Sequence, residues 1–171
     1  MTTDYETYYR DNPDGLGPQT AHLAKLIADH VPRGARVLDI GCGQGRDALP
    51  LARAGHAVVG VDLAPTGIAD MLAAADREGL AVTGVVADLR GFTPEGRFGL
   101  LLCDRTLHML DDPARDEVLV RLLEAVEAGG FCLIADEPSN MAGFKAVLDR
   151  DAGEWSLLHE TKNTFLARRV A

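Results

Sequence analysis

The chain has 171 residues, of which 47% are hydrophobic but only 5% aromatic, and this composition suits one globular domain packed from alanine, leucine and valine. A net charge of −9 opposes binding to a nucleic-acid backbone, and no cluster of lysine and arginine offsets it. We therefore expect a single domain over residues 1–171 whose partner is not a nucleic acid.

The three cysteines, Cys42, Cys103 and Cys132, lie in or beside apolar runs. No CxxC or Cys/His spacing indicates a metal site, so we expect buried free thiols, which are typical of a reducing cytosol. The first residues lack the basic and apolar regions of a signal peptide, and no apolar run reaches the roughly 18 residues of a membrane span. These observations predict a cytoplasmic protein with no metal and no membrane partner.

After a polar, turn-rich segment at 1–17, the spacing of apolar residues alternates between that of a helix and that of a strand. In chain order we expect a helix from 18 to 31, a strand at 36–40, a helix at 46–54, a strand at 57–61, a helix at 65–78, strands at 81–87 and 98–103, a helix from 112 that Gly129 and Gly130 close, a strand at 131–135, a helix at 141–148, and strands at 154–159 and 163–168. This alternation predicts an α/β fold, a Rossmann-like doubly wound sheet of about seven strands, mostly parallel, with helices on both faces.

A glycine-rich loop follows the first predicted strand. Gly41, Gly43 and Gly45 alternate with Cys42 and Gln44 and lead into a helix, an arrangement that builds nucleotide pockets at the carboxyl ends of parallel strands. The dinucleotide fingerprint GxGxxG would need a glycine at position 46, where this chain has arginine. The loop therefore favours an adenosyl ligand without a pyrophosphate, and a nicotinamide-dependent oxidoreductase stays the less favoured alternative.

Acidic residues stand at the ends of four predicted strands, where a ligand of such a sheet binds. Asp39 can hold loop amides or, through water, an ammonium group, and Asp62 can accept hydrogen bonds from ribose hydroxyls. Asp88 with Leu89 can bind an adenine edge, and Cys103-Asp104-Arg105 lies where a sulfonium methyl group would point.

Five segments resemble the successive motifs of class I S-adenosylmethionine (SAM)-dependent methyltransferases over residues 35–137. They are VLDIGCGQGRDALPLA, VVGVDLA, VVADL, FGLLLCDRTLHML and EAGGFCLIADE. Within that class, the stretch from the glycine loop onward is similar to the tellurite-resistance and thiopurine methyltransferase families. The resemblance implies a seven-stranded sheet whose last strand is antiparallel, SAM as cofactor and S-adenosylhomocysteine (SAH) as product.

The resemblance also implies roles for single residues. Asp39 and the three glycines would line the methionine part of SAM, together with the intervening Cys42 and Gln44. Asp62 would bind the ribose, Leu63 would lie against the adenine, and Asp88 with Leu89 would hold the base. Arg46 would contact the SAM carboxylate or cap neighbouring turns. Cys103 and Asp104 would lie near the methyl group.

The acceptor is expected to be a small molecule, a soft nucleophile, thiol or oxyanion, methylated by in-line displacement. His108 is the candidate base if the acceptor must lose a proton, and a helix-packing histidine is the alternative. Arg105 can bind an anionic acceptor or form a surface ion pair. Cys103-Asp104-Arg105-Thr106 replaces the Asn/Asp-Pro-Pro-aromatic motif of enzymes that methylate base or glutamine amino groups, which disfavours those acceptors.

An aromatic and basic group, Tyr5, Tyr8, Tyr9 and Arg10, precedes the first predicted helix. It forms either a lid that closes over SAM and contacts the substrate, or a partly disordered tail. His159 and Lys162 can reach the pocket from the last hairpin, although solvent exposure is favoured. The sequence leaves open a monomer or a homodimer, and a SAM-binding regulatory domain that performs no catalysis.

Overall fold

The computed structural model describes residues 4–13 and 15–170. The helices are α1 (Tyr5–Asp11), α2 (Ala21–His30), α3 (Ala48–Arg53), α4 (Pro65–Glu78), α5 (Asp112–Glu124) and α6 (Met141–Arg150), with a 3-10 turn η1 (Leu107–Met109). The strands are β1 (Arg36–Ile40), β2 (Ala57–Asp62), β3 (Val82–Val86), β4 (Phe98–Asp104), β5 (Val126–Ala135), β6 (Trp155–Glu160) and β7 (Thr164–Arg169).

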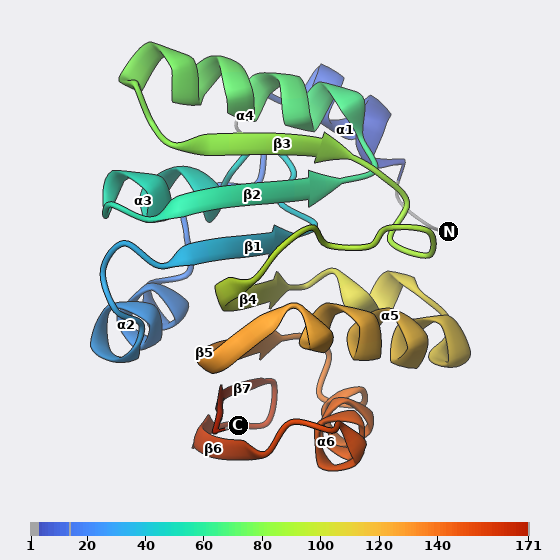
Figure 1. Cartoon of the computed structure of the whole chain (residues 1–171). Helices are drawn as coiled ribbons and strands as arrows, with labels where there is room; N and C mark the ends of the chain where they lie inside the picture. The colour runs from blue at the N-terminus through green and yellow to red at the C-terminus, as the bar shows by residue number, and fades with distance from the viewer. Residues whose placement is uncertain (1–3, 14, 171) are drawn as a thin grey trace.

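The strands form one seven-stranded sheet in the order β3-β2-β1-β4-β5-β7-β6. Neighbours from β3 to β5 are parallel, and β7 runs antiparallel to both β5 and β6. Figure 1 shows this order from green β3 at the top to the red hairpin at the bottom. The predicted doubly wound sheet with an antiparallel last strand is confirmed.

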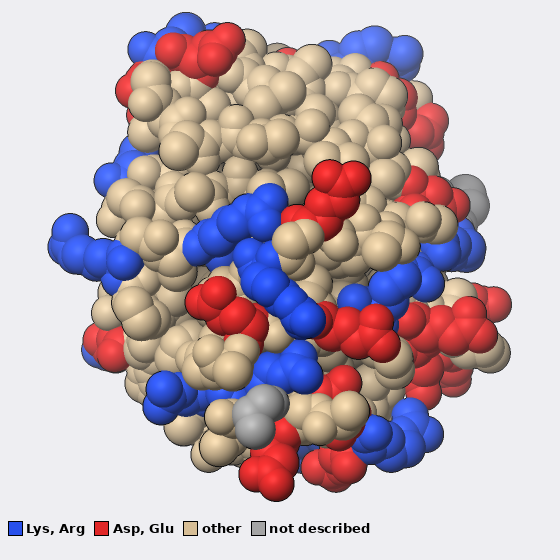
Figure 2. All heavy atoms as spheres, viewed as in Figure 1, with Lys and Arg blue, Asp and Glu red and all other residues tan. Residues whose placement is uncertain are grey.

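Helices cover both faces of the sheet because its buried strands direct alternate apolar residues to opposite sides. Leu100 and Leu102 of β4 pack with apolar residues of α2, α3 and α4. Leu101 and Cys103 of the same strand pack with those of α5 and α6. In the space-filling view of Figure 2, positive and negative side chains lie next to one another over the lower part of the molecule.

Two expected boundaries are wrong. The segment 1–17, expected to be turn-rich, contains helix α1, which begins after Asp4, whose carboxylate accepts a hydrogen bond from the Thr7 amide. Gly129 and Gly130 do not close α5, which ends at Glu124, but lie inside β5. The φ of 80° at Gly129 fits an irregularity in the strand, because the register between β4 and β5 shifts here.

The order of the strands reverses between β1 and β4, so that the crossovers on either side leave the carboxyl ends of these two strands uncovered. Helix α1 lies at this edge, beside the start of α4 (Figure 1). In the part of the chain that the structure describes, no helix combines the length and apolar character needed to cross a membrane.

Candidate functional site

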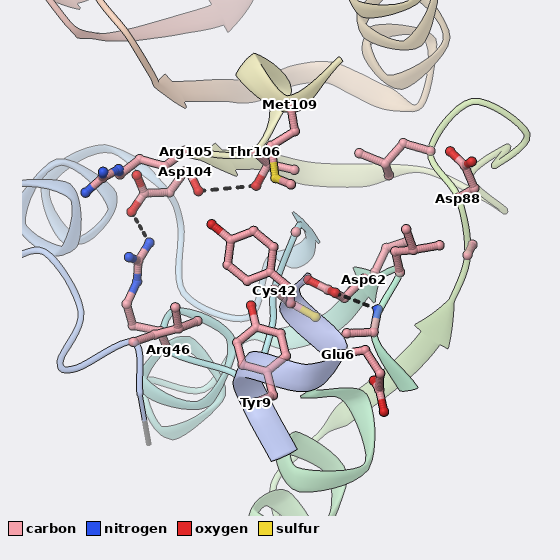
Figure 3. Close-up of a pocket in the computed structure, with 18 of the residues that line it drawn as sticks. Glu6, Tyr9, Cys42, Arg46, Asp62, Asp88, Asp104, Arg105, Thr106 and Met109 are labelled. Carbon is pink, nitrogen blue, oxygen red and sulfur yellow. Dashed lines mark hydrogen bonds and ion pairs between the residues drawn. The ribbon is translucent and has the colours of Figure 1, made fainter. Parts of the chain in front are cut away.

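A cavity of about 650 Å³ opens at the carboxyl ends of β1, β2 and β4. Its wall comes from α1, the glycine loop after β1, the segments after β2, β3 and β4, and the turn η1. Figure 3 shows the side chains that line it, with Tyr9 and Asp62 near the middle of the view. The fold thus gathers around one cavity segments that the sequence places at the ends of separate strands.

The glycine loop is packed tightly against the rest of the protein. Gly41, Gly43 and Gly45 have φ angles of 72°, 51° and 89°. A β-carbon at Gly41 would collide with the side chain of Thr106, whose Cβ lies 2.7 Å from that position. One at Gly43 would lie 2.9 Å from Cζ of Tyr9. Neighbouring protein atoms therefore require glycine in this loop.

The Asp62 carboxylate joins this loop to the segment after β2. Its Oδ2 accepts a hydrogen bond from the Gly43 amide and its Oδ1 accepts one from the Ala64 amide, both at 2.9 Å. Burial raises the pKa of Asp62, although these backbone hydrogen bonds oppose the shift. Leu63, which lines the cavity, is 67% exposed. A fixed carboxylate and an exposed apolar side chain therefore lie next to each other in the wall.

Asp88 and Leu89 line the same cavity from the loop after β3. The Asp88 carboxylate accepts a hydrogen bond from the Arg90 amide at 2.9 Å. Arg121, on α5, donates to the carbonyl oxygens of Leu89 at 2.8 Å and Phe92 at 2.7 Å. These contacts fix a loop that has no regular secondary structure.

Three buried carboxyl groups, those of Asp39, Asp47 and Asp104, interact with the one guanidinium group of Arg46. Arg46 Nη2 lies 2.9 Å from Asp47 Oδ2 and also pairs with Asp104. Burial raises the pKa of Asp39 well above its ordinary value, and the charge of Asp47 adds to the effect. Burial also raises the pKa of Asp104 to about 6, although Arg46 opposes the shift. The acids outnumber the compensating cation in this cluster.

Two carboxylate oxygens of this acidic cluster accept no hydrogen bond from the described residues. They are Asp39 Oδ2 and Asp47 Oδ1, both fully buried. An unpaired buried carboxylate is costly, so a positive charge placed nearby would be stabilised. Asp47 and Asp104 line the cavity, whereas Asp39 does not. The cluster therefore favours a cationic group at this end of the cavity.

Helix α1 lines the cavity and is fastened to the body of the protein. Tyr9 is 4% exposed and lines the cavity together with Tyr5. The Glu6 carboxylate accepts hydrogen bonds from the Thr66 amide at 3.0 Å and from its hydroxyl at 2.5 Å. Gln44 donates to the carbonyl oxygen of Tyr9 at 3.5 Å. The segment thus forms a helix that lines the cavity, and its roles as a lid over SAM and in contacting the substrate stay predictions.

Some predicted site residues lie outside the cavity wall, namely Tyr8, Arg10, Asp39, Gly43, Gln44, Gly45 and Cys103. The Tyr8 hydroxyl donates to the Gly15 carbonyl at 2.9 Å, and exposed Arg10 lies 3.3 Å from Asp11. Cys103 faces the core beneath α5 and α6. The roles of these residues in binding stay predictions.

The segment after β4 forms the other side of the cavity. Arg105 has a φ of 56°, which is uncommon for a residue with a side chain, and within the described ranges its guanidinium group has no ion-pair partner. His108, Met109 and Leu110 continue the wall. His108 Nδ1 lies 3.5 Å from Asp136 Oδ2. On this side of the cavity, the apolar Met109 and Leu110 therefore lie beside the polar Arg105, Thr106 and His108.

The last hairpin does not reach the cavity. His159 Nε2 instead lies 3.1 Å from His22 Nε2 at the surface, and Lys162 is exposed. Across residues 4–13 and 15–170, no group of three or more His, Cys, Asp or Glu side chains is arranged to hold a metal ion.

Some residues in or beside the site were not predicted from the sequence. Asp47 directly follows Arg46, and Asp136 directly follows β5, beside the end of β4. The strand-end rule that identified Asp62 would have identified Asp136. Glu6 and Leu16 had no such signal, because only the docking of α1 brings them to the cavity.

Comparison with known structures supports this architecture. A TehB-like SAM-dependent methyltransferase from Corynebacterium glutamicum superimposes with a TM-score of 0.72 at 26% identity, and 97% of each chain is covered. TehB from Haemophilus influenzae shares the fold, with a TM-score of 0.74 at 17% identity over 96% of this chain and 67% of that one.

Sequence relatives include the 2-heptyl-1-hydroxyquinolin-4(1H)-one methyltransferase of Mycobacteroides abscessus, 36% identical over 71% of this chain and 54% of the relative. The ribosomal protein L11 methyltransferase of Thermus thermophilus is 31% identical over 82% of this chain and 58% of its own. The chain thus spans little more than half the length of these curated relatives. The family model described as a methyltransferase domain matches residues 37–130. The predicted resemblance to SAM-dependent methyltransferases is confirmed, and the chain belongs to the methyltransferase domain family.

Proposed function

We propose that this protein transfers a methyl group from SAM to a small-molecule acceptor by in-line displacement and releases SAH. The observation that carries the proposal is a single cavity with a fixed Asp62 carboxylate at one end and an acidic cluster in need of a cation at the other. Membership of the methyltransferase family supports it.

The Asp62 end of the cavity fits the nucleoside part of SAM. Each Asp62 oxygen accepts one backbone hydrogen bond and keeps a second lone pair, which ribose hydroxyls can use. Exposed Leu63 offers an apolar surface for the adenine ring, and Asp88 with Leu89 can contact its polar edge.

The opposite end of the cavity fits the methionyl part. SAM has two positive charges here, its ammonium and its sulfonium, and one carboxylate. The acidic cluster supplies Asp47 and Asp104 at the cavity wall and the unpaired oxygen of Asp39 nearby. Arg46, also in the wall, can hold the ligand carboxylate. The charges of the cluster and of this part of the ligand are therefore complementary.

Bound SAM supplies an electrophilic methyl group, so the chain mainly has to position the acceptor and exclude water. Fixing the two reactants in line can account for about 7–11 kcal/mol of the barrier. Tyr5 and Tyr9 on closed α1 shield this space from solvent. Catalysis then depends more on the shape of the cavity than on a specialised side chain.

A small acceptor is supported by the remaining wall, which combines Tyr5, Leu16, Met109 and Leu110 with Arg105. The quinolone compound in the name of the M. abscessus relative is itself small and largely apolar. The net charge of −9 disfavours a nucleic-acid acceptor.

Calorimetry with SAM and SAH tests the proposal. Asp62→Ala should weaken SAM binding by more than about 1.5 kcal/mol, roughly tenfold, because hydrogen bonds to a charged group are lost. Asp76→Ala is the matched control. It removes an exposed carboxylate on α4, outside the cavity wall, and should leave SAM affinity unchanged. Absence of SAM binding to the wild type, or equal affinity of both variants, would contradict the proposed site. Binding without transfer to any acceptor would instead indicate a regulatory domain.

A further inference from the structure

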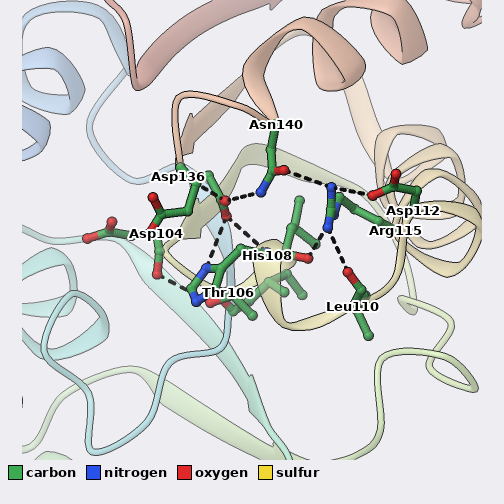
Figure 4. Close-up of polar contacts among 11 residues, drawn as sticks. Asp104, Thr106, His108, Leu110, Asp112, Arg115, Asp136 and Asn140 are labelled. Atoms are coloured by element: carbon green, nitrogen blue, oxygen red, sulfur yellow. Dashed lines mark hydrogen bonds and ion pairs between the residues drawn. The ribbon is translucent and has the colours of Figure 1, made fainter. Parts of the chain in front are cut away.

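A cluster of polar side chains lies behind His108, apart from the residues assigned above to the cofactor. His108 belongs to the turn η1 directly after β4 and lines the cavity. Its side chain is 30% exposed, yet its Nδ1 is fully buried and lies 3.5 Å from the Asp136 carboxylate (Figure 4). The accessible part of the ring is therefore the side that includes Nε2.

The Asp136 carboxylate is held firmly in place, with its side chain only 1% exposed. Oδ1 accepts hydrogen bonds from the Glu137 amide at 2.8 Å and from Asn140 Nδ2 at 2.9 Å. Oδ2 accepts one from the His108 amide at 3.2 Å. Three donors thus compensate for the burial of this carboxylate and aim Oδ2 at the histidine.

Arg115 on α5 fixes the next layer of the cluster. It donates to the carbonyl oxygens of Leu107 at 3.1 Å and Leu110 at 2.7 Å, at the two ends of η1. It also donates to Asn140 Oδ1 at 3.0 Å. Because arginine can only donate, Asn140 must turn its oxygen to Arg115 and its NH₂ group to Asp136. The orientation of the whole cluster is therefore determined.

We propose, on the basis of the proposed function, that the acceptor is a hydroxyl compound whose proton passes to Nε2 of His108, and that Asp136 is the positioning residue for this histidine. A carboxylate facing Nδ1 favours the tautomer with hydrogen on Nδ1, which leaves Nε2 free to accept a proton. The 3.5 Å separation is long for a hydrogen bond, and such contacts commonly shorten when substrate binds.

The proton and electrons balance without a further reactant. The acceptor oxygen forms its bond to the methyl carbon while the carbon–sulfur bond breaks, and the bonding pair returns to sulfur. The hydroxyl proton moves to His108 Nε2, and the resulting imidazolium lies against the Asp136 carboxylate until water removes the proton. A thiolate would need no such base, whereas a hydroxyl that is protonated at neutral pH does.

The surroundings of His108 indicate the body that carries the hydroxyl. Met109, 38% exposed, and Leu110 follow it in the chain and line the same cavity, to which Tyr5 contributes an aromatic ring from α1. The charged group that faces the imidazole is Asp136 (Figure 4), Arg115 contacts the backbone of η1 behind it, and Asp104 with Arg105 line the same cavity from the end of β4. An aromatic or alicyclic hydroxyl compound fits this wall better than a polyol.

The test measures SAM-dependent methylation of a panel of paired aromatic hydroxyl and thiol compounds by wild type and variants. Wild type should methylate hydroxyl compounds, and His108→Gln should lower kcat on them by about 100-fold or more. Asp136→Asn should lower kcat at least about tenfold and shift the pH at half-maximal kcat, with partial rescue by Asp136→Glu. SAM affinity should be unchanged in all three variants.

Glu137→Gln is the matched control, because Glu137 is exposed and contacts Asp136 only through its backbone amide. If Asp136→Asn fails to fold, His108→Gln still decides the question. Transfer to thiols alone, or full activity of His108→Gln, would overturn this inference and leave the proposed function standing. Loss of SAM binding by the wild type would instead remove the proposed function.

Discussion

Single atoms decide the geometry of the glycine loop. Position 41 has a positive φ, and the Thr106 side chain fills the space that a β-carbon would need. Thr106 is itself fixed, since its hydroxyl donates to the Ile40 carbonyl at 3.0 Å. The end of β4 therefore holds the loop after β1 in place, and the site depends on the packing of two adjacent strands.

Gly41→Ala should lower the free energy of unfolding by about 2–5 kcal/mol, the sum of a left-handed backbone and an overpacked contact. Gly34→Ala is the matched control, because Gly34 has a φ of 77° but no neighbour within 4 Å of the added carbon. It should cost only about 1–2 kcal/mol. Urea denaturation of both variants measures the difference, and equal losses would show that the contact with Thr106 is unimportant.

The acidic cluster predicts how SAM affinity varies with pH. Burial raises the folded-state pKa of Asp104 to about 6, above its ordinary value, so its ionised form is disfavoured in the free protein. Because its pKa is higher in the folded state, the protonated Asp104 contributes to folding stability. This contribution is fully present below about pH 4 and is lost as the pH rises through about 6. A bound cation favours the ionised form and reverses this cost. Asp39, whose pKa burial also raises, acts in the same direction.

SAM affinity should therefore increase from pH 5 to pH 7, with protons released on binding in the lower part of this range. In Asp104→Asn the dependence should be weaker, since the amide cannot ionise. Calorimetry in buffers of different ionisation enthalpy measures both affinity and proton release. A wild-type affinity that is constant or falls with rising pH would show that no cation binds at this cluster.

Residues at strand ends could be predicted from the sequence, because a buried run followed by an acid places that acid at a known edge of the sheet. Asp62, Asp88 and Asp104 all line the cavity for this reason. The support of His108 by Asn140 and Arg115 could not be predicted, since it depends on how α5 and α6 pack.

At the level of elements, long apolar runs such as β1, β2 and β4 were predicted to within a residue or two, because burial on both faces leaves an unbroken pattern. Helix α1 was not predicted, because its own residues do not determine its structure. It has seven residues, too few for a stable isolated helix, and it is held by contacts such as that of Glu6 with Thr66. Its structure is determined by distant residues.

Helix α1 should open when its contacts with α4 are removed. Glu6→Ala deletes both hydrogen bonds to Thr66, and we expect faster amide exchange in α1 and faster SAM dissociation, with little change in global stability. Asp11→Ala, at an exposed position at the end of the same helix, should change neither rate. Hydrogen exchange and stopped-flow dissociation are the measurements, and unchanged exchange in Glu6→Ala would show that other contacts hold the helix.

At the scale of the whole molecule, the cavity lies where parts from both halves of the fold meet. Its wall combines α1 with the segments after four strands, so one ligand would contact both halves of the doubly wound fold. Binding should then stabilise the folded chain as a unit, by an amount that mass action sets.

SAM at about 100 times its dissociation constant should add about 2.7 kcal/mol to the free energy of unfolding. For a chain of this size, that corresponds to a rise in Tm of roughly 5–11 °C. SAH should act similarly, whereas NADH should not, because Arg46 stands where the dinucleotide fingerprint has its third glycine. Thermal unfolding with each compound measures the shift, and Asp62→Ala should respond less than the wild type at the same SAM concentration. A rise in Tm with NADH but none with SAM would favour the oxidoreductase alternative, since only a ligand that binds the folded protein raises the Tm of that protein.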